Sequence, residues 1–277
     1  MARLSAFADE AAEDFAAQVD FLSREGISYL ELRLVNGQNI MDLNRRELAQ
    51  TRLMLQDHGI KISAIGSPIG KVSLEEPFDQ HQEKFKHAVE LASYFDTALI
   101  RIFSYFAPAG RNITACREEV MERLAAQVEL LKKSDITLVH ENEANIYGQT
   151  PDRCVDIVET INSPRLRLAY DPGNFVQNER IINNMDICWP VMKDYVVHVH
   201  IKDRKVDAET GCLPGRGDGQ IKELLAELAK INYQGFLTLE PHMAVSGVFS
   251  GFSGPELFSQ AIAAVREIAA ETGLSCA

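Results

Sequence analysis

Residues 196–203 read Val-Val-His-Val-His-Ile-Lys-Asp, a short β-branched run that ends in polar, metal-binding side chains. Three other apolar runs in the second half of the chain end in the same way. They are Ile-Thr-Leu-Val-His-Glu at 136–141, Leu-Arg-Leu-Ala-Tyr-Asp at 166–171 and Gly-Phe-Leu-Thr-Leu-Glu at 235–240. In a parallel barrel the carboxyl ends of the strands surround one mouth, so the four runs predict a cluster of side chains there.

Outward from these runs, short strand-like segments alternate with stretches of helical apolar spacing. Strict β–α alternation indicates a parallel sheet with right-handed crossovers, and eight such units favour a single α/β domain, a (β/α)8 TIM barrel over residues 1–277. An open doubly wound sheet is the competing topology, but no Gly-x-Gly-x-x-Gly follows the first strand. The expected strands are 3–7, 29–34, 61–65, 98–103, 136–141, 166–171, 196–200 and 235–240; the expected helices are 14–25, 44–58, 80–95, 117–133, 151–161 (with Thr150 as N-cap), 185–195, 221–231 and 255–272.

The composition excludes several classes of protein. A net charge of −12 disfavours general binding to nucleic acids, whose phosphates an acidic surface repels. No apolar run approaches the ~18 residues of a membrane helix, and the N-terminal segment reaches two acids before any long apolar stretch. Five cysteines without Cys-x-x-Cys spacing are typical of reduced thiols. We therefore expect a cytoplasmic protein with neither nucleic acid nor membrane as a partner.

The four strand ends carry Glu141, Asp171, His200 and Glu240. Residues two apart in a strand share a face, so all four side chains can point into the mouth. A single acid at a strand end is common in any α/β protein, but four such residues on successive strands would repel one another without a cation. Three carboxylates and one imidazole suit one divalent metal ion, with Mn²⁺ or Mg²⁺ favoured and Zn²⁺ or Co²⁺ compatible.

Four motifs resemble those of the xylose-isomerase-like TIM barrel superfamily of sugar (phosphate) isomerases and epimerases. They are Val-His-Glu-Asn-Glu, Tyr-Asp-Pro-Gly-Asn-Phe, His-Val-His-Ile-Lys-Asp and Gly-Phe-Leu-Thr-Leu-Glu-Pro-His, in the order of the family and over nearly the whole chain. The resemblance implies that Glu141, Asp171, His200 and Glu240 bind the metal and that Glu141 and Glu240 transfer protons. It implies a metal-dependent isomerase or epimerase of a sugar or sugar derivative, acting through a metal-stabilised enediolate, and it is compatible with a homo-oligomer.

Further polar residues at the strand ends are predicted to contact a small sugar substrate. For those on early strands the alternative is an ion-pair network between strands, and for the loop arginine it is a solvent-exposed position. Several epimerase relatives carry a histidine where this chain has asparagine. The predicted substrate-binding residues are Glu31, Arg33, Ser67, Arg101, Asn174, Lys202, Asp203 and Arg216.

Lysine and histidine side chains near the mouth admit other interpretations. Lys202 could form a Schiff base as in class I aldolases, but Asp203 beside it and the nearby metal set favour an orienting role. We expect His198 to be packed in the interior and His242 to line the pocket. The helical histidines are expected at the surface; they are His58, His81 and His87.

Three alternative functions remain open. A dehydratase or lyase acting on a keto-polyol begins with the same proton abstraction but expels a hydroxyl group. An apurinic-site endonuclease shares the barrel, but that family uses additional histidines on early strands, where this chain has Ser67 and Ser104, and its acidic surface does not suit DNA. A sugar-binding barrel without catalysis is the third.

Overall fold

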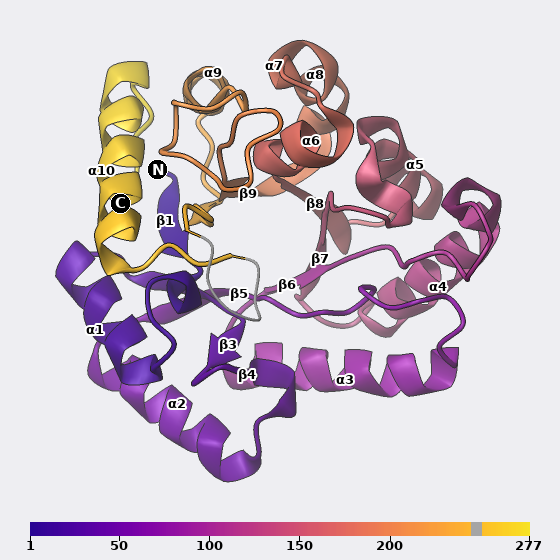
Figure 1. Ribbon diagram of the computed structural model, residues 1–277. Helices are drawn as coiled ribbons and strands as arrows, with labels where there is room; N and C mark the ends of the chain where they lie inside the picture. The colour runs from indigo at the N-terminus through magenta and orange to yellow at the C-terminus, as the bar shows by residue number, and fades with distance from the viewer. Residues whose placement is uncertain (245–250) are drawn as a thin grey trace.

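Eight parallel strands close into a barrel at the centre of the molecule (Figure 1), which confirms the predicted (β/α)8 TIM barrel. The computed structural model describes residues 1–244 and 251–277. Around the ring the order is β1-β10-β9-β8-β7-β6-β5-β2, so strands that follow one another in the chain are neighbours. The barrel strands, each within two residues of its expected ends, are β1 Arg3–Ala6, β2 Tyr29–Leu32, β5 Lys61–Ile65, β6 Leu99–Ile102, β7 Thr137–Glu141, β8 Leu166–Tyr170, β9 Val196–Ile201 and β10 Phe236–Leu239.

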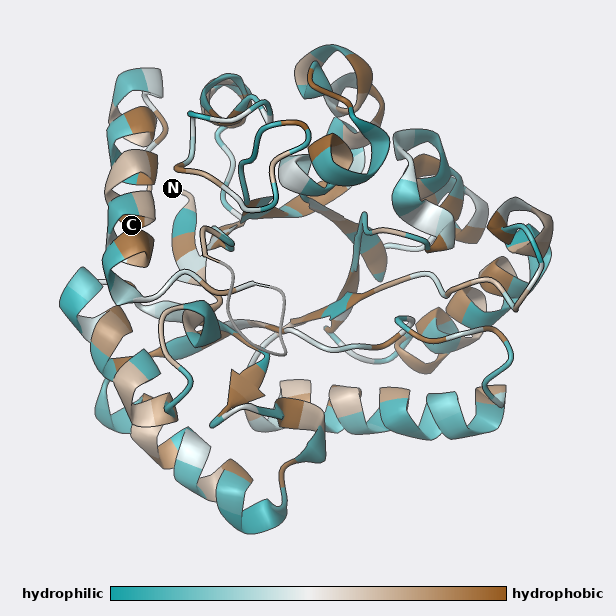
Figure 2. Cartoon of the chain, in the orientation of Figure 1, coloured by the Kyte–Doolittle hydropathy of each residue, from teal (hydrophilic) through white to brown (hydrophobic). Residues whose placement is uncertain are grey.

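Helices surround the barrel and turn their apolar faces toward it, while their outer faces are largely hydrophilic (Figure 2). Every expected helix is present, although 185–195 is broken into short pieces. Thr150 stands at the N-cap position of α5 but its side chain makes no capping bond. The helices that match expectations are α1 Phe15–Glu25, α2 Arg45–Asp57, α3 Phe78–Tyr94, α4 Arg117–Leu130, α5 Pro151–Ile161, α7 Asn184–Ile187, α8 Trp189–Met192, α9 Ile221–Lys230 and α10 Pro255–Thr272; short 3-10 helices are η1 Ala8–Glu10, η2 Ile40–Asp42, η3 Ile113–Cys116, η4 Tyr147–Gln149 and η5 Lys193–Tyr195.

One helix at the mouth was not expected from the sequence. Helix α6, Pro172–Glu179, begins directly after β8. Its Pro172-Gly173 pair looks like a turn, but proline is favoured at the first helical position, where its missing N–H is not needed. Asp171 caps this helix, because its side chain accepts from the backbone N–H of Asn174 at 2.9 Å.

A two-stranded hairpin beside β2 was also unexpected. Strands β3, Leu34–Val35, and β4, Gln38–Asn39, pair antiparallel outside the barrel sheet. The turn between them is Asn36-Gly37, and both residues have positive φ (51° and 75°). Asn-Gly is the strongest short-range signal for such a turn, so the sequence did contain the information.

The inside of the barrel is polar. The Oγ atoms of Ser5 on β1 and Ser63 on β5 lie 2.7 Å apart, and Thr238 Oγ1 on β10 lies 3.1 Å from His198 Nε2 on β9. All four residues are buried. The apolar core instead fills the layer between strands and helices. Buried polar groups need hydrogen-bond partners, and here they find them within the barrel.

Two further features bear on the expected environment. In residues 1–244 and 251–277 no helix combines the length and hydropathy needed to cross a membrane. All five cysteines are free.

Candidate metal centre

The four predicted ligands meet at the carboxyl ends of adjacent strands. Glu141 ends β7, Asp171 follows β8, His200 lies in β9 and Glu240 follows β10. Each offers one ligand atom, and these atoms all lie within 4.8 Å of one another. All four side chains are buried, none more than 3 % exposed. The arrangement could therefore hold a single ion. The four residues are those that the sequence analysis proposed as ligands.

Asp171 is held by the backbone of Asn174 and by the side chain of Asn142. Its Oδ1 caps α6, its backbone N–H donates to Asn142 Oδ1 at 3.0 Å, and its carbonyl accepts from Asn142 Nδ2 at 2.8 Å. Its other carboxylate oxygen, Oδ2, lies 3.1 Å from Lys202 Nζ. One oxygen is thus committed to the fold, and the other faces the centre.

Glu240 shows the same division between its two oxygens. Oε1 accepts from Arg33 Nη1 at 3.0 Å and lies 3.3 Å from His242 Nε2. Oε2 lies 3.2 Å from Lys202 Nζ and 3.7 Å from His200 Nδ1. The cationic groups on the Oε1 side fix the carboxylate so that Oε2 points toward the other proposed ligands.

Glu141 and His200 face each other with unused hydrogen-bonding capacity. His200 Nδ1 lies 3.1 Å from Glu141 Oε1, which also accepts from Asn174 Nδ2 at 3.2 Å. Glu141 Oε2 lies 3.3 Å from Arg101 Nη1. Within the described part of the chain, both Glu141 Oε2 and His200 Nδ1 are buried without a hydrogen bond. Orphaned buried atoms of this kind, among three carboxylates and an imidazole, fit a hard or borderline divalent cation.

The charges around the centre keep two of its carboxylates ionised, whereas burial raises the pKa of the third, Asp171, to about 6. Burial acts to raise the pKa of Glu141, but His200 and Arg101 outweigh it and lower that pKa to about 2. Burial likewise acts against Glu240, but Lys202 and His242 hold its pKa well below the usual range. Ionised carboxylates are the form that binds a metal ion.

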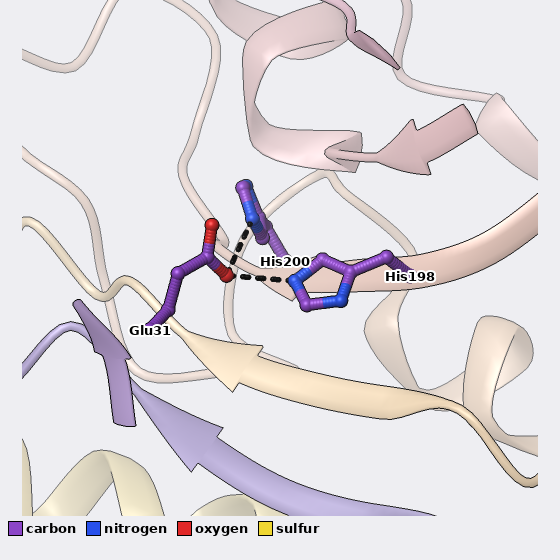
Figure 3. A group of neighbouring side chains, drawn as sticks. All are labelled: Glu31, His198 and His200. Carbon is purple, nitrogen blue, oxygen red and sulfur yellow. Dashed lines mark hydrogen bonds and ion pairs between the residues drawn. The ribbon is translucent and has the colours of Figure 1, made fainter. Parts of the chain in front are cut away.

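Beneath the centre, Glu31 connects two histidines of β9 (Figure 3). Its Oε2 lies 2.7 Å from His198 Nε2 and 3.3 Å from His200 Nε2, and all three side chains are fully buried. A 2.7 Å hydrogen bond leaves no room for an ion between its two atoms. Glu31 instead holds the Nε2 side of His200, which leaves Nδ1 facing the carboxylates above. Metal-binding histidines usually have such a carboxylate behind them.

A cavity of about 870 Å³ opens above the centre, and several of the predicted site residues line it. Arg33 binds Asp9 through two nitrogens, at 2.8 and 2.9 Å. Arg101 lies between the rings of Phe7 and Phe103, at 5.2 and 5.0 Å from their centroids. Of the predicted set, Arg33, Arg101, Lys202, Glu141 and Glu240 line this cavity.

Glu31, Ser67, Asn174, Asp203 and Arg216 do not line that cavity. Ser67 donates to the Arg101 carbonyl at 2.5 Å, and Asn174 braces Glu141. The Asp203 carboxylate accepts from the backbone N–H groups of Arg204, Gly215, Gly217 and Gly219, at 2.8 to 2.9 Å, and so organises its own loop. Arg216 lines a separate depression of about 420 Å³ beside α10. Glu31, Ser67, Asn174 and Asp203 thus support other parts of the site, Arg216 lies apart from it, and the predicted role of all five in binding substrate stays a prediction.

The structure also shows where the lysine and histidine side chains named in the sequence analysis lie. Burial acts to lower the pKa of Lys202, but Asp171 and Glu240 outweigh it and raise that pKa, which keeps the amine protonated and unsuited to Schiff-base chemistry. His198 is interior and His242 lines the cavity, as predicted. His58 is exposed and His87 partly exposed, but the surface prediction for His81 is wrong. His81 is buried and its Nε2 accepts from the Gly70 backbone at 3.0 Å.

The sequence analysis missed two cavity residues, Asp9 and Lys71, and one buried acid beside the cavity, Glu10. Asp9 follows β1, and Lys71 lies in the loop after β5, where it pairs with Glu143 at 3.0 Å. Glu10 is fully buried and lies 3.0 Å from His242 Nε2. The sequence did indicate Asp9 and Glu10, because both lie within three residues of the end of the first expected strand.

Comparison with known proteins places these observations in a wider group. A family model described as xylose isomerase-like TIM barrel matches residues 19–276. An uncharacterized protein of Methanocaldococcus jannaschii is 23% identical over 172 residues, which is 57% of this chain and 55% of that protein, so the match spans about half the length of that relative.

Solved structures share the fold over almost the whole chain at low identity. A xylose isomerase-like TIM barrel protein from Mycobacterium smegmatis in complex with magnesium has a TM-score of 0.76 at 15% identity, covering 99% of this chain and 97% of that one. A probable 3-DHS dehydratase from Bacillus anthracis gives 0.75 at 17%, covering 96% and 99%. D-psicose 3-epimerase from Clostridium cellulolyticum H10, solved with D-tagatose, gives 0.73 at 15%, covering 96% and 99%.

Proposed function

Because the chain belongs to the xylose isomerase-like TIM barrel family, we propose that it is a metal-dependent isomerase or epimerase of a sugar or sugar derivative, with residues 1–277 forming one catalytic domain. The observation that carries the proposal is the convergence of ligand atoms from Glu141, Asp171, His200 and Glu240 within 4.8 Å at the barrel mouth. Active sites on this fold lie at that mouth.

The four residues would hold one divalent cation, with Mn²⁺ or Mg²⁺ favoured. When bound, such a cation supplies Lewis-acid stabilisation of negative charge that develops on a substrate oxygen. Arg33 and Arg101 each contact one carboxylate of the centre, Glu240 and Glu141 respectively, and both line the cavity. These guanidinium groups can donate hydrogen bonds to sugar hydroxyl or acid oxygens.

Glu141 and Glu240 are the proposed proton-transfer pair. Both line the cavity, and both are held in the ionised form that can accept a proton. An isomerase needs a carboxylate to carry a proton between neighbouring carbons, and an epimerase needs carboxylates on both faces of one carbon. Two glutamates that approach the cavity from β7 and β10, on either side of His200, are compatible with both reactions.

A dehydratase or lyase is the second candidate, and one observation favours it. Expelling a hydroxyl group requires a proton donor, and His242 lies at the mouth between Glu10 and Glu240, at 3.0 and 3.3 Å. Burial and Lys202 act to lower the pKa of His242, but the two glutamates outweigh them and raise it to about 9. The charged imidazolium could donate that proton.

Proton NMR in D₂O separates the two reactions. Metal-free protein is loaded with Mn²⁺ and the excess ion is removed. The protein is incubated with candidate ketoses and sugar acids in D₂O, and spectra are taken after the reaction is quenched. Solvent deuterium at the carbon next to the carbonyl, with all hydroxyl groups retained, is expected for an isomerase or epimerase. Loss of water and a new vinyl signal would instead identify the dehydratase.

Glu141→Gln and Glu240→Gln test the assignment of residues. Each is expected to lower turnover by about 10²–10⁴-fold, because a proton acceptor is lost, and to weaken Mn²⁺ binding. Glu159→Gln, on the outside of α5 where its side chain accepts from Tyr195, is the matched control. Near-normal activity in both active-site variants would rule out the proposed pair.

A further inference from the structure

Lys202 contacts two of the four residues that a bound cation would need. Its Nζ lies 3.1 Å from Asp171 Oδ2 and 3.2 Å from Glu240 Oε2. These are the oxygens that the fold leaves available, since Asp171 Oδ1 caps α6 and Glu240 Oε1 binds Arg33. The ammonium group and a metal ion would therefore compete for the same two atoms.

The local structure makes room for this lysine. A Cβ atom at Gly173 would lie 2.7 Å from Lys202 Cγ and 2.8 Å from its carbonyl oxygen. Glycine in the first turn of α6 therefore lets the lysine stem pass closely over the helix, with its ammonium beside Asp171. Lys202 is 4 % exposed and lines the cavity, so the end of its side chain has space on the mouth side.

The other cations of the cavity have different attachments. Lys71 pairs with Glu143, and Arg33 binds Asp9 as well as the outer oxygen of Glu240. Neither contacts an oxygen that faces the centre. Arg101 lies 3.3 Å from Glu141 Oε2 and so contacts one carboxylate of the centre. Lys202 differs because its ammonium group contacts two of the proposed ligands, Asp171 and Glu240.

The ammonium group of Lys202 reduces the electrostatic repulsion between the carboxylates of the centre. Three buried carboxylates without a neutralising cation repel one another, which would open the centre before any metal arrives. We propose that Lys202 is an internal substitute for the metal ion: it holds Asp171 and Glu240 together in the metal-free protein and leaves their inner oxygens when a divalent cation binds. Once displaced, its ammonium group turns toward the cavity, where substrate oxygens become its acceptors. This inference rests on the metal site of the proposed function.

The proposal predicts an effect of unusual sign. If Lys202 competes with the cation, Lys202→Met should bind metal more tightly than the wild type, because nothing has to be displaced. The same change should lower the melting temperature of the metal-free protein, because the carboxylates lose their partner. A lysine that only orients the carboxylates for metal would give weaker metal binding on removal.

The test uses the full chain stripped with a chelator. Mn²⁺ is titrated into wild type, Lys202→Met and Lys71→Met by isothermal titration calorimetry, and thermal unfolding is followed with and without Mn²⁺. We expect the Kd of Lys202→Met to fall about tenfold or more, and the rise in melting temperature on adding Mn²⁺ to exceed that of the wild type. Lys71→Met should match the wild type in both.

Two kinds of result would overturn the proposal, and they are distinguishable. If the wild type does not bind Mn²⁺, the metal site and this inference fail together. If the wild type binds but Lys202→Met binds equally or more weakly, the role of Lys202 alone is wrong. Should Lys202→Met fold only with Mn²⁺, the release of the ion to excess chelator replaces the titration: slower release than from the wild type is expected, and equal or faster release counts against the idea.

Discussion

The two halves of the barrel contribute differently to the mouth. The last four strands along the chain, β7 to β10, position all four proposed ligands. Of the first four, β1, β2, β5 and β6, the strands β2 and β6 contribute charged residues that contact those ligands from behind or from the side. Glu31 lies 3.3 Å from His200, Arg33 3.0 Å from Glu240, and Arg101 3.3 Å from Glu141. The second half thus supplies the donor atoms, and the first half fixes their orientation and charge.

This division explains why ligand residues alone do not make the site. A free carboxylate or imidazole can rotate about its own side-chain torsions. Here Asp171, Glu240 and His200 each have one atom hydrogen-bonded to the backbone or to the first half, and Glu141 lies in an ion pair with Arg101. The atom that remains faces the centre. Metal affinity and turnover should therefore depend on first-half residues that never touch the metal.

Glu31→Gln is the strongest test of that dependence. The amide keeps the size of the side chain but removes the charge that holds His200 Nε2, so the ring is no longer fixed with Nδ1 toward the carboxylates. We expect the affinity for Mn²⁺, measured by calorimetry, to fall about 10–100-fold. In a Co²⁺-loaded sample the visible absorption bands should also shift, since the geometry at the ion changes.

Ser63→Ala provides the control for Glu31→Gln. Ser63 is equally buried inside the barrel, where its hydroxyl binds Ser5, but it contacts no proposed ligand. It should lose some stability and keep its Mn²⁺ affinity. Equal affinities in wild type and Glu31→Gln would mean that the two halves are independent, which contradicts the comparison.

Arg101→Met should have a smaller effect, on substrate more than on metal. The guanidinium lies between two aromatic rings at the cavity wall, and its Nε is buried without a hydrogen bond among the described residues. Methionine keeps the apolar packing but removes the donor groups and the charge beside Glu141. We expect kcat/KM to fall about tenfold, the cost of one hydrogen bond to a charged group, with Mn²⁺ affinity changed less.

Kinetics and calorimetry on the same preparations check Arg101→Met. Arg153→Met, on the surface where the side chain donates to Thr114, is the matched control and should behave as the wild type. A loss of metal binding as large as that of Glu31→Gln, without a separate change in KM, would show that Arg101 serves the ligands and not the substrate.

The sequence predicted the second half well because its signal is local. An apolar run that ends in an acid or histidine predicts both a strand and the place of the side chain at its end. Neighbouring parallel strands then bring such ends together. The spacing of two residues also places Glu31 and Arg33 on one face of the β2 segment. It gives the face of a side chain but not its depth in the barrel. Arg33 therefore reaches the mouth, whereas Glu31 lies below it against His198.

Other residues could not be placed because their contacts come from distant segments. Asp203 was predicted in the mouth from its position beside Lys202, but four backbone N–H groups of its own loop and the 215–219 segment bind its carboxylate. His81 was expected at the surface from its helical setting. Helical spacing in fact places it with Phe85 and Ala88 on the buried face of α3. What the spacing could not show is that the loop after β5 supplies its hydrogen-bond partner, the Gly70 N–H.

His81 separates stability from metal binding most clearly, with the smallest effect on the site. It is 1 % exposed, and burial lowers its pKa to about 4, although Glu76 acts in the opposite direction. The unfolded chain has a histidine pKa of about 6.5, so below that pH the unfolded state binds a proton that the folded state does not. The contribution of His81 is complete above about pH 6.5 and is lost as the pH falls toward about 4, to a total of about 3 kcal/mol.

His81→Gln should therefore have a flatter pH dependence than the wild type. The measurement is the free energy of unfolding in urea between pH 7 and pH 4.5, on chelator-treated protein so that metal release does not contribute. The variant should be less stable than the wild type at pH 7, because the imidazole ring that packs against Tyr105 is lost, and the difference should narrow as the pH falls. Its Mn²⁺ affinity at pH 7 should match that of the wild type. His81 binds the loop after β5, and the charged residue of that loop, Lys71, pairs with Glu143, which is not a proposed ligand. A fall in affinity comparable to that of Glu31→Gln would mean that this loop also shapes the centre, and the first half would then act on the ligands through its packing as well as through its charges.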